Sequence, residues 1–264
     1  MMDAVKAGAT ILRKGGSALD AVVAGVVILE DHPLFNAGYG STLNVDGAVE
    51  MDASVMFVTD EETKAGAVAA ISRVRNPVQL ARAVMEHTPH VMMAGSGAER
   101  FARDRGIKLC DPDAMIAPRA RERFLARLKR QHELGFAREG HGTVGAAAVD
   151  IHGQLAAATS TGGVPGKMAG RVGDSAIIGA GTFANQYAAA SATGHGEAIV
   201  MASLCRETIE ALGSALGKTD PTRIARRKIA ELIAPQHSEA GIILVDRTGR
   251  IGYAHNADTM EVGI

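Results

Sequence analysis

Helices and strands are expected in blocks along this chain, not in strict alternation. Apolar residues at helical spacing predict helices over residues 2–13 and 17–29 before any strand begins. Short β-type runs follow, with Asp46-Gly47 as the turn of a first hairpin, and Asn76-Pro77 then starts a helix with Asn as its cap. The other expected elements are helices at 97–105, 196–216 and 221–233 and strands at 42–45, 50–57, 65–71, 143–150, 154–160, 241–245 and 251–255. Such blocks favour stacked layers of helices and mainly antiparallel sheets.

The composition supports the same layered fold class. The 264 residues include 31 glycines and no tryptophan, and aromatic residues make up 3%. A core with so few aromatics must be built from Ala, Val, Ile, Leu and Met, and the many glycines imply tight turns and close backbone approaches. We expect one large α+β domain, or at most two small ones.

The charge balance argues against a nucleic-acid partner. The chain has 28 Lys and Arg residues against 29 Asp and Glu, a net charge of -1, whereas an electrostatic nucleic-acid binder needs a basic face. Seven Lys and Arg residues do gather between Arg119 and Arg138. We interpret this segment as a solvated helix or a linker at an internal boundary, because basic runs are more often solvated faces than nucleic-acid sites.

The cellular setting is predicted from what the sequence lacks. No apolar run reaches the ~18 residues of a membrane span, and the N-terminal residues show no targeting pattern. Two cysteines, Cys110 and Cys205, cannot form a disulfide framework or a Cys-rich zinc site. We therefore expect unreactive reduced thiols, no membrane partner and a cytoplasmic location.

The common short catalytic motifs are missing or incomplete. The sequence contains no G-x-S-x-G, no P-loop and no H-E-x-x-H motif, and its nine histidines lack metal-ligand spacing. Residues 179–184, GAGTFA, match the dinucleotide fingerprint, but another glycine cluster follows where that fingerprint needs a long helix. We expect no cofactor for catalysis.

Four glycine-rich segments form the strongest constellation. They span residues 142–145, 159–163, 170–175 and 193–197. Each places a hydroxyl group, a charge or a turn among glycines, where a small ligand can lie against backbone N–H groups. Arg171 offers a fork for a carboxylate and Asp174 a partner for an ammonium, which together suit an amino-acid head group. Spacing alone leaves open the alternative that Arg171 and Asp174 pair with each other in a surface turn.

These segments, together with LEDHPLFNAGYG at residues 29–40 and MDAS at 51–54, resemble the plant-type L-asparaginase / isoaspartyl peptidase family. Members of that family are N-terminal-nucleophile hydrolases, and the resemblance extends from the first helix to Asn256. It implies a four-layer αββα sandwich formed by residues 1–264 as a single domain. It also implies self-cleavage between Gly142 and Thr143, which gives an α chain of residues 1–142 and a β chain of residues 143–264.

A threonine at a new N-terminus is a chemically sound catalyst. Its hydroxyl is a poor nucleophile at neutral pH and needs a base. Cleavage frees an α-amino group on the same residue, and a reference pKa of about 7.7–8.0 lets that group act as the base. Thr143 and Thr161 also sit in or beside strand-like runs, where threonine is common for its β-propensity alone.

The resemblance assigns roles around this nucleophile. Thr143 attacks the substrate, Thr161 hydrogen-bonds to Thr143 and positions it, and Asn36 lies beside it. The Thr193 hydroxyl and the Gly194 N–H form the oxyanion hole, where one such donor typically contributes ~3–4 kcal/mol of transition-state stabilisation.

The resemblance also implies how substrate and a structural ion are held. Arg171 binds the α-carboxylate, Asp174 the α-ammonium, and Gly196 lines the pocket through its backbone, whereas His195 tunes or fills the pocket without a catalytic role. The family wraps a sodium ion with backbone carbonyls, which suit a hard cation. The matching carbonyls belong to Leu29, Glu30, His32, Phe35, Ala37 and Tyr39.

The chain departs from the family pattern at its start. Family members usually begin with a strand that carries a His-Gly-Gly segment, whereas this sequence opens in the following helix, so we expect an exposed sheet edge. Residues 58–63 predict a longer hairpin turn than is usual.

The expected activity is hydrolysis of the side-chain amide of L-asparagine or of the β-aspartyl bond of isoaspartyl dipeptides, by a homodimer of αβ units. One alternative is a glycosylasparaginase-like amidase of the same superfamily. The other is an unprocessed, catalytically silent scaffold or binding module that lacks the first strand.

Overall fold

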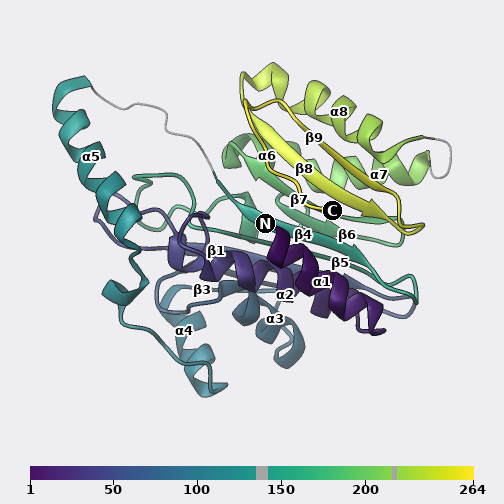
Figure 1. Ribbon diagram of the computed structural model, residues 1–264, viewed down its shortest axis with the longest axis horizontal. Coiled ribbons are helices and arrows are strands. Elements are labelled where there is room, and N and C mark those ends of the chain that lie inside the picture. The colour runs from purple at the N-terminus through teal and green to yellow at the C-terminus, as the bar shows by residue number, and fades with distance from the viewer. Residues whose placement is uncertain (135–141, 216–218) are drawn as a thin grey trace.

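Two β-sheets lie face to face between two layers of helices (Figure 1). The computed structural model describes residues 1–134, 142–215 and 219–264. In this described part, the first sheet runs β3 (Met92–Ala94), β2 (Thr63–Ile71), β1 (Met51–Val58), β5 (Leu155–Thr161) and β4 (Val144–Val149). The second runs β6 (Thr182–Ala184), β7 (Ala188–Gly194), β8 (Ala240–Asp246) and β9 (Ile251–His255). Apart from the parallel pair of β2 and β3, all pairings of these strands are antiparallel.

Helices cover both outer faces of the sandwich. Helices α2 (Ala18–Asp31) and α3 (Pro77–His87) pack on the first sheet, and α1 (Met2–Arg13) packs on α2. Helices α6 (Gly196–Ala202), α7 (Leu204–Ser214) and α8 (Pro221–Leu232) lie on the side of the second sheet (Figure 1). Helix α4 (Gly95–Asp104) follows β3, and α5 (Pro118–Leu134) projects from one end of the sandwich. The predicted four-layer αββα sandwich is confirmed.

Small side chains let the two sheets approach closely. The apolar layer between them includes Ala157 of β5 and Ala189 of β7, both fully buried, with Met56, Leu155 and Val245 around them. A side chain on Gly145 of β4 would come within 2.8 Å of Ser191 Cβ of β7. The low aromatic content therefore has a structural reason, because this interface has little room for large rings.

Some predictions about helices, strands and helix caps are wrong. The single helix expected over residues 196–216 is two helices, because Ser203 adopts left-handed backbone with φ +48° and breaks it. The strand expected at 42–45 is reduced to one bridge between Leu43 and Val49. Asn76 precedes α3 as predicted, but its side chain does not cap the helix; the Glu30 carboxylate accepts from the Val78 N–H at 3.0 Å instead.

The basic segment is helical where it can be described. Helix α5 spans Pro118–Leu134, which agrees with the interpretation of a solvated helix, while residues 135–138 of the predicted segment lie outside the described residues. The glycine fingerprint at 179–184 leads into strand β6 instead of a long helix, so it is not a dinucleotide site of the usual geometry. The turn between β1 and β2 is the predicted hairpin, closed by Thr59 N–H donating to the Glu62 carbonyl at 2.9 Å.

Strand β4 ends the first sheet in the described part of the chain, but its residues are buried or half-buried. Residues 145–149 line an apolar groove of about 340 Å³, together with residues of α1 and β8. Both cysteines are free thiols, and burial raises the pKa of Cys205 well above its usual value, which keeps it unreactive. None of the described helices has the length and apolar character needed to cross a membrane.

Candidate active site

The bond between Gly142 and Thr143 lies at the start of β4, beside the end of β5. Val144 pairs with Ser160 in the β4–β5 register, which places Thr143 next to Thr161. The Thr143 hydroxyl donates to Thr161 Oγ1 at 3.1 Å, and the Thr161 hydroxyl donates in turn to the Gly142 carbonyl at 3.1 Å. The two hydroxyls and the carbonyl of the predicted cleavage site therefore form one continuous hydrogen-bond chain.

Asn36 supplies a second donor to the same carbonyl. Its Nδ2 donates to the Gly142 oxygen at 2.8 Å and to the Gly163 oxygen at 2.6 Å, while its Oδ1 accepts from the Thr42 N–H at 2.8 Å. A side chain on Gly162 would come within 2.6 Å of Asn36 Oδ1, so this position needs glycine. The amide of Asn36 is fixed by its surroundings, with one face turned to the Gly142–Thr143 bond.

The structure excludes the pairing of Arg171 with Asp174 that spacing left open. Arg171 instead makes a two-pronged ion pair with Glu197, with Nε and Nη2 donating to the two carboxylate oxygens at 3.0 and 2.9 Å. Partial burial opposes ionisation of Glu197, but its own backbone N–H and Arg171 together hold its pKa below the usual value. Glu197 was not predicted as a site residue, although it lies in the glycine-rich segment 193–197.

Asp174 is a buried carboxyl group surrounded by bare backbone. A side chain on Gly181 would come within 2.7 Å of its Oδ2, and one on Gly196 within 3.1 Å of its Oδ1. Oδ2 has no hydrogen-bond partner within the described residues. Burial raises the pKa of Asp174 to about 7, with Arg171 acting in the opposite direction. The two glycines let backbone pack directly against this carboxyl, and a buried carboxyl without a hydrogen-bond partner gains from pairing with an ammonium group.

Asp52 links the two halves of this site and was not predicted. It lies opposite Thr161 in the β1–β5 register. Its Oδ2 accepts from the Gly173 N–H at 3.0 Å and its Oδ1 from the Ala70 N–H at 2.9 Å. Burial raises the pKa of Asp52, against the opposing field of Lys167. Asp52 therefore holds the segment that carries Asp174 next to the strand end that carries Thr161; its place in the MDAS segment was the available signal.

Thr193 and Gly194 end strand β7 on the opposite sheet. Gly194 has φ +135°, which strongly favours glycine, and the chain then turns so that the His195 N–H donates to the Glu239 carbonyl at 2.8 Å. Helix α6 starts directly afterwards at Gly196, the residue that lies against Arg171 and Asp174. The His195 ring lies 3.7 Å from the Glu197 carboxylate and is partly exposed.

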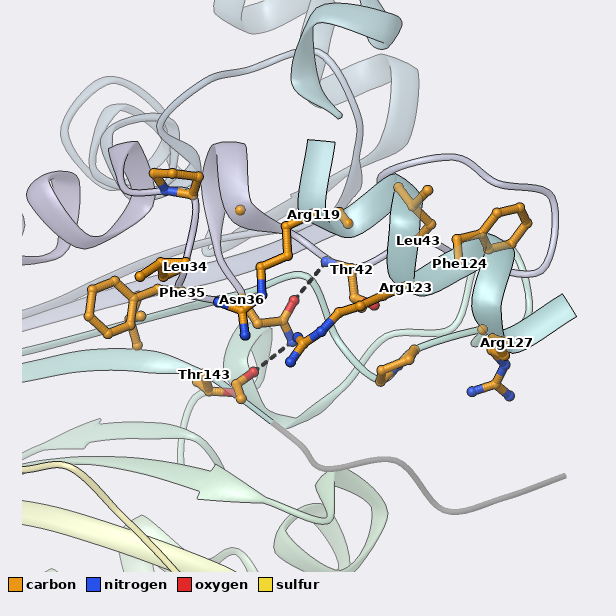
Figure 2. Close-up of a pocket in the computed structure, with 17 residues that line it drawn as sticks. Leu34, Phe35, Asn36, Thr42, Leu43, Arg119, Arg123, Phe124, Arg127 and Thr143 are labelled. Carbon is orange, nitrogen blue, oxygen red and sulfur yellow. Dashed lines mark hydrogen bonds between the residues drawn. The ribbon is translucent and has the colours of Figure 1, made fainter. Parts of the chain in front are cut away.

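A cavity of about 520 Å³ opens beside Thr143 (Figure 2). It lies between helix α5, the loop after α2 and the turn at Pro165 and Gly166. Its lining residues are Pro33, Leu34, Phe35, Asn36, Gly40, Thr42, Leu43, Arg119, Ala120, Arg123, Phe124, Arg127, Gly142, Thr143, Val144, Pro165 and Gly166. Neither Arg171 nor Asp174 is among them, so the cavity does not include the residues predicted to hold the aspartyl part of a substrate.

The loop predicted to hold sodium is tightly wrapped. A side chain on Gly40 would collide with the Phe35 carbonyl oxygen and come within 3.0 Å of that of His32, and one on Gly38 would come within 2.5 Å of the Glu30 oxygen. Four of the six predicted sodium ligands, the carbonyls of Leu29, His32, Phe35 and Ala37, also accept hydrogen bonds from backbone N–H groups within the loop. Among the described residues, no group of three His, Cys, Asp or Glu side chains could hold a metal ion.

Comparison with known proteins defines the class. The sequence model of a family described as Asparaginase matches residues 1–264. This chain belongs to that family, and it is a hydrolase. The family resemblance identified from the motifs is confirmed.

Three relatives make the likeness more specific. The isoaspartyl peptidase/L-asparaginase of Mus musculus is 45% identical over 244 residues, covering 92% of this chain and 73% of the relative. The protein of the same name from Homo sapiens is 43% identical and covers 94% of this chain and 80% of its own. The plant-type L-asparaginase of Pyrococcus furiosus is 42% identical over 270 residues, covering 98% of this chain and 86% of its own.

Proposed function

We propose that this protein cleaves its own chain between Gly142 and Thr143 and then uses Thr143 to hydrolyse L-asparagine and isoaspartyl dipeptides. The names of the relatives support this substrate range over the glycosylasparaginase alternative. The observation that carries the proposal is the hydrogen-bond chain from Thr143 through Thr161 to the Gly142 carbonyl, with Asn36 as a second donor.

Self-cleavage follows from that chain. The Thr143 oxygen attacks the Gly142 carbonyl carbon while Asn36 and Thr161 donate to the carbonyl oxygen, where negative charge develops. The C–N bond breaks, the Thr143 nitrogen takes up the proton from the hydroxyl, and an ester links Gly142 to Thr143. Water hydrolyses the ester, which leaves a carboxylate on Gly142 and a free amine and hydroxyl on Thr143. The α chain is then residues 1–142 and the β chain residues 143–264.

The freed amine serves as the base for the second reaction. It takes the proton from the Thr143 hydroxyl, whose oxygen attacks the side-chain carbonyl of the substrate. The Thr193 hydroxyl and the Gly194 N–H stabilise the oxyanion, and the proton passes to the leaving ammonia or amino acid. Water then releases aspartate from the ester on Thr143.

Arg171 and Asp174 orient the aspartyl part of the substrate. Asp174 pairs with the α-ammonium, and Gly196 provides the space for it. Arg171 receives the α-carboxylate, and its ion pair with the more exposed Glu197 keeps the guanidinium in place before substrate arrives. These two residues fix which end of the amino acid faces Thr143.

Further features of the proposal concern assembly and ions. Carbonyls of the loop at residues 29–40 would bind a structural sodium ion, which adds rigidity beside Asn36 and no step to the reaction. We infer a homodimer of αβ units in the cytoplasm, a compartment that suits the free thiols Cys110 and Cys205.

Mass spectrometry followed by activity assays tests the proposal. Purified protein should separate into two chains under denaturing conditions, release ammonia from asparagine and release leucine from β-aspartyl-leucine. Thr143→Ala should remain one chain of about 27.4 kDa and be inactive, whereas Thr143→Ser keeps a hydroxyl and should still be cut. An active protein that stays in one piece would refute the mechanism, and an uncut, inactive protein would favour the silent scaffold. Sugar release from glycosylated asparagine would instead favour the glycosylasparaginase alternative.

A further inference from the structure

We propose that Arg119, Arg123 and Arg127 of helix α5 form a subsite that binds a negatively charged leaving group, so that isoaspartyl peptides with a free carboxylate on the leaving residue are preferred substrates. This inference rests on the proposed function. It adds a specificity determinant on an element that contributes neither the nucleophile nor the residues that hold the aspartyl part.

The three arginines occupy one face of α5. They are spaced four residues apart, which places them in a row along the helix. All three line the cavity beside Thr143. Figure 2 shows Arg119 and Arg123 extending toward Asn36 and Thr143, while Arg127 lies farther along the helix. A side chain on Gly166 would come within 2.6 Å of the Arg127 guanidinium carbon, so Arg127 closes the far end of the cavity.

The described lining of the cavity carries positive charge. Among its described residues are three arginines and no Asp or Glu. Within the side chains that the structure describes, none of the three has an ion-pair partner, whereas Arg171 is held by Glu197. A concave surface with one sign of charge concentrates ligands of the opposite sign. Arginine also binds carboxylates through paired hydrogen bonds.

The position of the cavity identifies which part of a substrate would enter it. The scissile carbonyl must lie at the Thr143 hydroxyl, and the aspartyl part must reach Arg171 and Asp174, which lie outside the cavity. The part that leaves therefore extends into the cavity, whose volume of about 520 Å³ is in the range of small-molecule sites.

The chemistry of the leaving group distinguishes the two substrate types. Asparagine releases ammonia, which carries no carboxylate and gains nothing from the arginines. An isoaspartyl dipeptide releases an amino acid whose α-carboxylate can pair with Arg119 or Arg123, and a leaving glutamate adds a second carboxylate. The subsite thus favours isoaspartyl dipeptides, most of all those with an acidic leaving residue.

A substrate series on the self-cleaved wild-type protein tests the subsite without any substitution. The kcat/KM of β-aspartyl-leucine should exceed that of β-aspartyl-leucine amide by about tenfold, the ratio that one charge-assisted hydrogen bond supports. β-Aspartyl-glutamate should be better still, and higher salt should reduce these differences. Equal kcat/KM values for the acid and the amide would overturn the subsite while leaving the proposed function intact.

Variants assign the preference to the helix. The double variant Arg119→Gln/Arg123→Gln should lower the acid-to-amide ratio to about one, whereas Arg121→Gln, an exposed arginine of the same helix outside the cavity lining, should keep the wild-type ratio. A double variant that keeps the wild-type ratio would overturn the proposal. If the cut wild-type protein hydrolyses neither asparagine nor any β-aspartyl peptide, the proposed function falls and the subsite falls with it.

Discussion

The Thr143 hydroxyl donates to the Thr161 hydroxyl across 3.1 Å, and this contact orders the whole site. Because the Thr161 hydrogen is directed to the Gly142 carbonyl at 3.1 Å, the Thr161 oxygen is free to accept from Thr143 and from the Gly163 N–H. Thr161 can therefore take part in both proton movement and carbonyl polarisation during self-cleavage.

Replacing Thr161 tests that dual role. Thr161→Val keeps the shape of the side chain but removes the hydroxyl, so we expect self-cleavage to slow by about 100-fold or more. Thr161→Ser restores the hydroxyl and should recover most of the rate. The fraction of cut chain against time, measured by mass spectrometry, gives both values; a valine variant that is cut at the wild-type rate would contradict the role.

A substitution at Gly196 should weaken substrate binding and leave self-cleavage unchanged. Gly196→Ala would place a methyl group within 3.1 Å of Asp174 Oδ1 and within 2.7 Å of Arg171 Nη2. We expect normal self-cleavage but a KM for asparagine raised by about tenfold, because the methyl group occupies the space meant for the ammonium. Gly97→Ala is the matched control, since a Cβ there has no atom within 4 Å. An unchanged KM in Gly196→Ala would show that substrate lies elsewhere.

Asp174 makes substrate binding depend on pH. Burial raises its pKa to about 7, so the free site is protonated below that pH and cannot pair with an ammonium. We expect kcat/KM for asparagine to fall by about tenfold per pH unit below pH 7. Calorimetry in two buffers at pH 6 should also detect proton release when L-aspartate binds. An affinity for L-aspartate that is equal at pH 6 and pH 8 would argue against this assignment.

The buried Glu30 carboxyl makes the folded protein less stable as the pH rises. It is fully buried, its Oε2 has no hydrogen-bond partner in the described part of the chain, and burial raises its pKa to about 8 from 4.5. The folded protein therefore retains a proton that the unfolded chain loses above pH 4.5, so this group makes the free energy of unfolding fall between about pH 4.5 and pH 8.

Glu30→Gln removes that dependence and keeps an acceptor for the Val78 N–H. We compare the free energy of unfolding of the variant with that of the wild type. The difference should favour the variant by at least about 1 kcal/mol more at pH 8 than at pH 5. Urea unfolding in a Thr143→Ala background, where the chain stays in one piece, measures the effect. The control Glu61→Gln, in the exposed β1–β2 turn, should leave the pH dependence of the free energy of unfolding unchanged. A Glu30→Gln variant with the wild-type pH slope would refute the account.

Local sequence patterns predicted most helices and strands. Elements without such a pattern were missed. The Ser17 hydroxyl accepts from the Asp20 N–H at 3.1 Å, so the predicted start of α2 is correct. Strands β6 and β7 were not predicted, because the alanines that fill β7 have low β-propensity and become strand through pairing with β8. The cap of α3 was assigned to Asn76, but the acceptor comes from Glu30, which is remote in sequence.

The sequence alone determined the residue types of the site, because each glycine-rich segment carries its own hydroxyl or charge in a local motif. Tertiary structure decided what those groups meet. Asn36 reaches the Gly142 carbonyl across 106 residues, Arg171 pairs with Glu197, and the arginines of α5 face a cavity. These outcomes depend on which surfaces the sheets bring together and on how much water they exclude, and burial of that kind, which also sets the pKa of Asp174, is not encoded in any one segment.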